Sequence, residues 1–426
     1  MASGSTSEDS PIGNPAFRLY LSAMVLGTLA IQIQTVAIAW QVFGITKANH
    51  ANAALALGAV GLAEVIPFVS SVLFAGHIAD KNNRRFIACT SLTVLLLLSL
   101  VLFLPSLVHT DWLKLTILYG VVVCGGLARS FLTTARQAMI AEIIPRSQIP
   151  SAVRWRNTLF ELSSVIGPGL SGVLIWLDGE YLSYSAASIL LIGALFANLL
   201  IRTSQELQSR QVEPIFQSLR TGIHFMLSQR AMLGAFTMDL FAILLGGAVA
   251  LLPIFAEMLN VGAVGFGLLR AATSSGAVIM SVYLIFRPAF RHAGRTLYYS
   301  FAIFGACIIG FGLSIHLASV LGLGLQAAFI FSFLFLFISG AADAVNVIIR
   351  QTILQTSVPP EMMGRVSAVT AVFIGCSNEL GMAESGLAAR LLGTVNSVVF
   401  GGLCVFGVMG VIHWRFPEIS RLQKIT

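Results

Sequence analysis

Residues 92–104 read LTVLLLLSLVLFL, and residues 329–338 read FIFSFLFLFI, so both runs are apolar on nearly every face. A strand of a membrane β-barrel would instead alternate apolar and polar residues over about ten positions. These runs therefore predict helices that cross a lipid bilayer. The whole chain agrees, because 57% of its residues are hydrophobic and only 10% are charged, which excludes a water-soluble globule.

Twelve apolar segments of this kind follow one another along the chain, as many as 426 residues hold at about 35 residues per helix and loop. They cover residues 17–43, 53–74, 86–107, 113–136, 151–177, 182–201, 231–259, 265–286, 296–316, 321–350, 365–391 and 395–414. We therefore expect an all-α membrane protein of two six-helix bundles. The bundles span residues 17–201 and 231–415, and a polar linker at 202–230 joins them.

Lysine and arginine gather in the loops that follow the even-numbered helices, whereas the opposite loops hold only Lys47, Lys114 and Arg390. Because positively charged loops stay in the cytoplasm, both termini and the linker are predicted to be cytoplasmic in an inner (plasma) membrane. The net charge of +7 follows mostly from this bias, so it does not indicate nucleic-acid binding.

The segments outside the two bundles are expected to form two tails and a linker helix. Residues 1–16, rich in Ser, Gly and Pro, predict a disordered cytoplasmic tail, and residues 416–426 a second tail. Within the linker, Ile215, Leu219, Ile223 and Met226 recur at steps of three and four, which predicts an amphipathic helix on the membrane surface. The five cysteines lie in apolar runs without paired spacing, so we expect no disulfide, metal site or cofactor.

An internal repeat relates the two bundles at a shift of 214 positions. The matches are Gly126 with Gly340, Arg136-Gln137 with Arg350-Gln351, Gly167 with Gly381, Ser171-Gly172 with Ser385-Gly386, and Gly179 with Gly393. Most are glycine or arginine, residues with special backbone or interface demands. The second bundle therefore repeats the first in the same direction, a transporter layout in which substrate binds between the halves.

Residues 76–85 read GHIADKNNRR, which resembles the signature loop of the major facilitator superfamily. Gly76 allows close approach of helices, Asp80 can accept hydrogen bonds from a helix N-terminus, and Arg84 can pair with Asp80. Asn83 stands where the family has glycine, and asparagine also tolerates a left-handed backbone. The resemblance implies that this loop, with Arg84 and Arg85, closes the cytoplasmic side when the transporter faces outward.

Helix five contains Gly167-Pro168-Gly169-Leu170-Ser171-Gly172, which is similar to the antiporter signature of that superfamily, with Ser171 replacing a glycine. Residues 250–256, 267–272 and 37–42 resemble its exporter branch of enterobactin-type siderophore and macrolide efflux proteins. The resemblance implies a twelve-helix fold, alternating access, and export by antiport.

Acidic residues inside the bilayer are costly, so they usually face the bundle interior or a wet cavity. Six qualify: Glu64, Glu161, Asp239, Asp343, Glu379 and Glu384. By the repeat, Arg129 matches Asp343, and the family's cavity helices imply that Arg129, Asp239 and Asp343 can meet. They would form a proton or substrate site, or else a structural ion pair between the halves. Glu379 and Glu384 lie about 140° apart around a helix, so at most one reaches the cavity.

These features predict a proton-coupled exporter of an amphipathic organic compound, such as a drug or a siderophore-like metabolite, and not an enzyme. Its cavity would be lined by Gln34, Trp40, Gln41, Phe241 and Asn346. Uptake by proton symport, a non-transporting sensor and a lipid mover are the alternatives. One chain holds both halves, so we expect a monomer whose partners are the substrate, protons and the bilayer.

Overall fold

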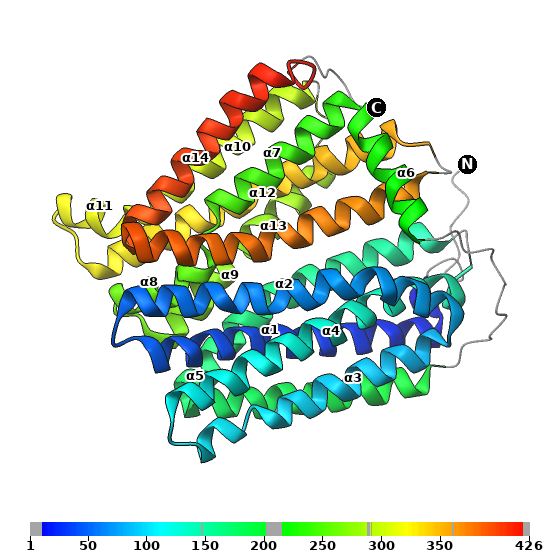
Figure 1. Ribbon diagram of the computed structural model, residues 1–426, viewed down its shortest axis with the longest axis horizontal. Helices are drawn as coiled ribbons and strands as arrows, with labels where there is room; N and C mark the ends of the chain where they lie inside the picture. Colours follow the sequence, from blue (N-terminus) through cyan, green and yellow to red (C-terminus); the bar gives the residue numbers. More distant parts are fainter. Residues whose placement is uncertain are drawn as a thin grey trace, which may run out of the picture. The chain divides into compact units, whose positions relative to one another are not determined.

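The computed structural model describes residues 11–145, 148–201, 215–287, 290, 292–359 and 362–420, and within these ranges a few side chains lie outside the description. Every regular element in these ranges is a helix (Figure 1). The chain forms two compact units. Unit 1 comprises Met1–Ile38 and Ile66–Val212, and unit 2 comprises Ala39–Val65 and Glu213–Thr426.

The first half of the sequence forms long helices that are apolar along most of their length. They are α1 (Pro15–Thr46), α2 (His50–Lys81), α3 (Arg84–Val101), the short 3-10 helix η3 (Leu104–Leu107), α4 (Asp111–Ile143) and α5 (Ile149–Leu200). Within unit 1, α3 packs against α4 and α5. The unit has its own apolar core, which includes the fully buried Tyr20, Leu92 and Leu132.

The second half repeats this plan with more interruptions. Its elements are α6 (Ile215–Ser228), α7 (Arg230–Gly246), η5 (Val249–Leu251), α8 (Leu252–Met258), α9 (Gly262–Ile285), α10 (Ala293–Gly312), α11 (Ser314–Val320), α12 (Leu325–Ser357), α13 (Met363–Leu392) and α14 (Thr394–Arg415). In unit 2, α12 packs against α9 and α10, while α7 packs against α13 and α14 (Figure 1). A separate core contains Phe236, Leu297 and Ile349.

The twelve predicted spanning helices are present. Ten segments of the described residues are long and apolar enough to cross a membrane. One of them, Ser151–Leu200, breaks at Asp178 and Gly179 into two helices. The 30-residue α13 supplies the remaining helix.

The contacts confirm the repeat residue by residue. Ser171 donates to the carbonyl of Ile33 at 3.0 Å, and Ser385, 214 positions later, donates to the carbonyl of Gly247, 214 positions after Ile33. Gly179 and Gly393 also match, and each joins two helices with a positive φ, 72° and 87°, that favours glycine. Both halves are therefore built on one pattern of helix contacts.

The boundaries of the units differ from those of the predicted bundles. Residues 39–65, the end of α1 and the beginning of α2, belong to unit 2 because they pack on its helices. The predicted tails also contain ordered parts: Asn14 donates to the carbonyl of Ile143 at 2.9 Å, and Ile419 is fully buried. Residues 1–10 and 421–426 lie outside the described residues.

The linker contains the predicted helix, α6, but the helix packs on protein. A Cβ atom at Gly222 would lie 2.8 Å from the carbonyl oxygen of Arg365 in α13, and Met226 is 2% exposed within the core of unit 2. Ile223 and Leu227 on α6 are exposed. The helix therefore packs on unit 2 through one face, and its place on the membrane surface stays a prediction.

A pair of glycines two residues apart on α5 tests the packing of α5 on α1. A Cβ atom at Gly167 would lie 2.5 Å from the Cβ atom of Gln32 in α1, whereas a Cβ atom at Gly169 would meet nothing within 4 Å. We expect Gly167→Ala to lower the free energy of unfolding by about 1 to 3 kcal/mol through overpacking. Gly169→Ala should leave it unchanged or raise it, because alanine favours helix. Thermal unfolding in detergent measures both, and equal effects would contradict the close α1–α5 contact.

Candidate functional site

A buried ion pair lies in the core of unit 2. Arg350 on α12 donates from Nη1 to Oδ2 of Asp239 on α7 at 2.5 Å, and the two side chains are only 4% and 2% exposed. The guanidinium also lies over the ring of Phe236, with 5.7 Å between Cζ and the ring centroid. Because burying either charge alone costs several kcal/mol, each makes the other tolerable in this core.

Asp343 adds a second acid to this pair. It interacts electrostatically with both Arg350 and Asp239. Among the described residues, Oδ1 of Asp239 and Nε of Arg350 have no hydrogen-bond partner. Two carboxylates around one guanidinium carry one excess negative charge, and a single proton removes it. The cluster can therefore exist in a neutral and an anionic form.

Arg350 is a partner of Asp239 that the sequence analysis did not name. The repeat and the family's cavity helices suggested Arg129, which lies on α4 in unit 1, while Asp239, Asp343 and Arg350 lie in unit 2. The meeting of Arg129 with the two aspartates stays a prediction. In the sequence, Arg350 is the last residue of the tenth predicted segment. In the structure it is 3% exposed inside α12, which continues to Ser357. Its position at the end of an apolar run was the signal available in the sequence.

Unit 1 contains the counterpart of Arg350. Arg136 on α4 donates from Nη2 to the carbonyl of Ala23 on α1 at 2.9 Å, and Tyr20 donates to the carbonyl of Arg136 at 3.1 Å. Val25 stands 214 positions before Asp239. Thus the matching arginines reach a backbone carbonyl in the first half and a carboxylate in the second.

Two of the remaining acids lie in a second charged cluster in unit 2. Arg270 on α9 interacts electrostatically with Glu379 on α13 and Glu64 on α2. The sequence analysis named both glutamates but treated Arg270 only as part of a family-like stretch. Glu384 lies near Cys404 of α14, and Glu161 on α5 is exposed. No group of three or more His, Cys, Asp or Glu side chains suited to a metal occurs among the described residues.

The predicted cavity residues occupy different environments. Gln34 of unit 1 is 8% exposed, and Phe241 of unit 2 is 41% exposed. The ring of Trp40 stacks on Phe266 of α9 with 5.7 Å between centroids, and Gln41 is 8% exposed. Asn346 is fully buried and accepts a hydrogen bond from Ser300 of α10. In this structure Asn346 therefore joins α12 to α10 instead of facing an open surface.

The predicted gate loop is mostly helical. Residues 76–81 belong to α2, and the side chains of Gly76 and Asp80 lie outside the described residues. Asn83 has φ −61° and ψ 111°, so it is extended; its side chain caps α3 by accepting from the backbone N–H of Phe86 at 3.2 Å. Asn83 therefore does not use the left-handed backbone that asparagine tolerates, since an N-cap residue has an extended backbone.

Arg84 and Arg85 connect α3 to its neighbours in unit 1. Arg84 lies 3.0 Å from Oε1 of Glu142 at the end of α4 and donates to the carbonyl of Ala138 at 3.1 Å. Burial raises the pKa of Glu142, and the charge of Arg84 partly offsets this rise. Arg85 donates to the carbonyl of Leu199 in α5.

The helix-five motif packs α5 on α1. Gly167 faces Gln32 with no room for a side chain, Pro168 lies inside the helix, and Ser171, next to Gly172, binds the carbonyl of Ile33. This close packing is what a glycine- and proline-rich segment permits. The motif therefore has a structural role within unit 1.

Comparison with known proteins covers nearly the whole chain. A family model described as transmembrane secretion effector matches residues 6–425. The enterobactin exporter EntS of Shigella flexneri is 25% identical over 407 residues, which cover 93% of this chain and 91% of that protein. An uncharacterized MFS-type transporter, YfiS of Bacillus subtilis (strain 168), is 26% identical over 375 residues, which cover 83% and 82%.

Solved structures agree on the fold. The crystal structure of a D-xylose-proton symporter matches with a TM-score of 0.73 and 11% identity, covering 96% of this chain and 99% of that one. A POT family transporter in complex with 5-aminolevulinic acid matches with a TM-score of 0.69 and 11% identity, covering 95% and 97%. At this identity the likeness shows the fold alone, two six-helix halves.

Removing Arg350 tests the buried pair. We expect Arg350→Ala to lower the free energy of unfolding by about 3 to 5 kcal/mol, because Asp239 then remains charged and buried. Arg230→Ala is the matched control, since Arg230 makes an exposed pair with Glu418 at 2.9 Å and such pairs contribute about 1 kcal/mol or less. Adding Asp239→Ala to Arg350→Ala should restore part of the loss. Thermal unfolding in detergent measures these losses of stability. Equal losses in Arg350→Ala and Arg230→Ala would contradict the pairing.

Proposed function

Because the chain belongs to the transmembrane secretion effector family of major facilitator superfamily transporters, we propose that it exports an amphipathic organic compound in exchange for protons. The family and the relatives named above are membrane transporters, not enzymes. Export is supported by the relative named as an enterobactin exporter and by the antiporter-like segment in α5. The proposed substrate class is supported by the same enterobactin exporter relative. It is also supported by the apolar segment around Trp40 and the amide of Gln41.

The observation that carries proton coupling is the sharing of Arg350 by Asp239 and Asp343 in the core of unit 2. A proton on either acid turns an anionic cluster into a neutral one. Since a buried net charge is costly, gain or loss of this proton changes the relative stability of conformations that bury the cluster differently. Such a change is what couples proton movement to alternating access.

A second function, uptake by proton symport, retains one observation in its favour. The helix-five segment lacks a glycine of the antiporter pattern, with Ser171 in its place, and Ser171 is used to bind α1. Direction can be measured in a hypersensitive efflux-deficient strain. An exporter confers resistance to its substrate, whereas a symporter that takes up the same compound increases sensitivity.

Asparagine substitutions test the proton site. Asp239→Asn and Asp343→Asn imitate a permanently protonated acid, so substrate counterflow in proteoliposomes should remain while pH-driven accumulation falls at least about tenfold. Asp111→Asn, an exposed acid beside Lys114, should leave both measurements unchanged. Full pH-driven transport in both cluster variants would exclude this cluster and direct attention to Glu64 and Glu379.

The proposed orientation places both termini and α6 in the cytoplasm. A reporter that is active only outside the cytoplasm should give no signal when fused after residue 202, because this region carries several arginines. The same reporter near Trp112, at the beginning of α4, should be active. The reverse pattern would show that the chain has the opposite orientation in the membrane. An unchanged mechanism would then move the substrate in the opposite direction.

A further inference from the structure

The chain turns back into the core of unit 2 after its last helix. It leaves α14 at Phe416, and residues 417–420 form a turn in which the N–H of Ile419 donates to the carbonyl of Phe416 at 3.2 Å. Ile419 is fully buried and belongs to the same apolar core as Phe236 and Leu297. A residue outside the helices therefore contributes to the core that the helices of unit 2 share.

Two glycines make the space for this turn. A Cβ atom at Gly234 of α7 would lie 2.6 Å from Cδ1 of Ile419 and 2.9 Å from the Cβ atom of Phe416. A Cβ atom at Gly294 of α10 would overlap the carbonyl oxygen of Ile419, so the two backbones are in direct contact there. The helices α7 and α10 both pack on α14. The turn that follows α14 thus contacts the beginnings of both helices.

The first half of the chain differs at both glycine positions. Gly234 stands 214 positions after Tyr20, which is 2% exposed and whose hydroxyl donates to the carbonyl of Arg136 at 3.1 Å. Gly294 stands 214 positions after Asp80, the acid of the signature loop. The second half therefore has glycine, in place of a large and a charged residue, at both places where the turn packs.

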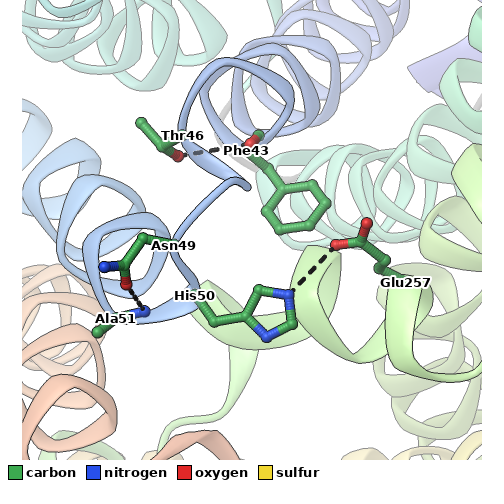
Figure 2. A network of polar contacts seen from close by, with 6 residues as sticks. All are labelled: Phe43, Thr46, Asn49, His50, Ala51 and Glu257. Carbon is green, nitrogen blue, oxygen red and sulfur yellow. Dashed lines mark hydrogen bonds and ion pairs between the residues drawn. The ribbon is translucent and has the colours of Figure 1, made fainter.

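An ion pair beside the turn adds little to this attachment. Nη1 of Arg230 at the beginning of α7 lies 2.9 Å from Oε1 of Glu418, and the two side chains are 56% and 36% exposed. A contact of similar exposure joins His50 of α2 to Glu257 of α8, with 3.7 Å between Nε2 and Oε2 (Figure 2). Water weakens the attraction in both. The turn is therefore held mainly by the burial of Ile419.

We propose that residues 416–420 form a clip that fastens the beginnings of α7 and α10 to each other at one end of unit 2. Ile419 touches both helices, so release of its side chain detaches both from the turn. Asp239 lies five residues after Gly234 on α7, so the clip positions the helix that carries the buried ion pair. The clip requires neither a particular substrate nor proton coupling.

Thiol labelling of purified protein in detergent tests the clip without substrate or gradient. In a variant without native cysteines, Leu297→Cys places a thiol three residues after Gly294, where the native side chain is fully buried. We expect Ile419→Asp to raise the rate of labelling by maleimide at least about tenfold, because a buried charge expels the turn and α7 and α10 separate more often. Pro417→Asp is the matched control, since Pro417 is exposed on the same turn, and it should leave the rate unchanged.

A second thiol distinguishes opening of the clip from general loosening of unit 2. Cys307, 7% exposed on α10, is kept as the single cysteine in a parallel series. It lies ten residues beyond Leu297, about 15 Å along the helix, so its labelling should not respond to Ile419→Asp. Equal increases at both thiols, or native labelling of the Leu297→Cys thiol in Ile419→Asp, would overturn the proposal.

The variant Gly294→Ala tests the backbone contact of the clip. Its added methyl group overlaps the carbonyl oxygen of Ile419, so labelling of the Leu297→Cys thiol should again rise at least about tenfold. Combined with Ile419→Asp it should add less than about twofold, because the turn has already left. A further tenfold rise in the double variant, on the order of the first, would show that Gly294 packs on another part of the chain and would overturn the proposal. Where Ile419→Asp fails to fold, Ile419→Ala takes its place with an expected rise of at least about threefold, and native labelling in that variant would contradict the clip.

Discussion

The cost of burying a charge in hydrocarbon is the constraint on which the rest of this structure depends. Apolar side chains alone would let the helices slide and rotate against one another, since lipid is as apolar as leucine. An arginine inside the bundle restricts this sliding, because its guanidinium needs a hydrogen-bond acceptor at a fixed position. Arg350 donates to Asp239, and Arg136 donates to the carbonyl of Ala23. The charges of Glu379 and Glu64 act on the buried Arg270. These positions fix the relation of neighbouring helices.

The internal repeat explains why the two halves fold alike yet differ chemically. Hydrogen bonds of Ser171 and Ser385 and the turns at Gly179 and Gly393 are the same in both halves. Backbone packing has therefore been retained where only glycine or serine fits. Titratable groups differ, because Asp239 lies in the second half where Val25 stands in the first. The shared scaffold thus has a buried carboxylate at this position in the second half and an apolar valine in the first.

The sequence predicted the number of helices, the linker helix and the repeat, because apolar length and glycine spacing are local properties of the chain. It did not predict the partner of Asp239. Arg350 ends the tenth predicted segment, where an arginine usually marks the membrane surface, whereas α12 continues for seven residues beyond it. Residues 39–65 were placed with the first half, since no local pattern shows which unit a helix end contacts.

The two charged clusters of unit 2 differ in what they join, and this difference bears on mechanism. Asp239 and Arg350 connect α7 to α12, two helices of the second half, so this pair holds no segment from the first half of the sequence. The charges of Glu379 on α13 and Glu64 on α2 both act on Arg270 of α9. The helix α13 packs on α7 and also carries Glu379, so one helix borders both groups of charges. Glycine holds this helix close to α7, because a Cβ atom at Gly381 would lie 2.9 Å from the carbonyl oxygen of Ile243.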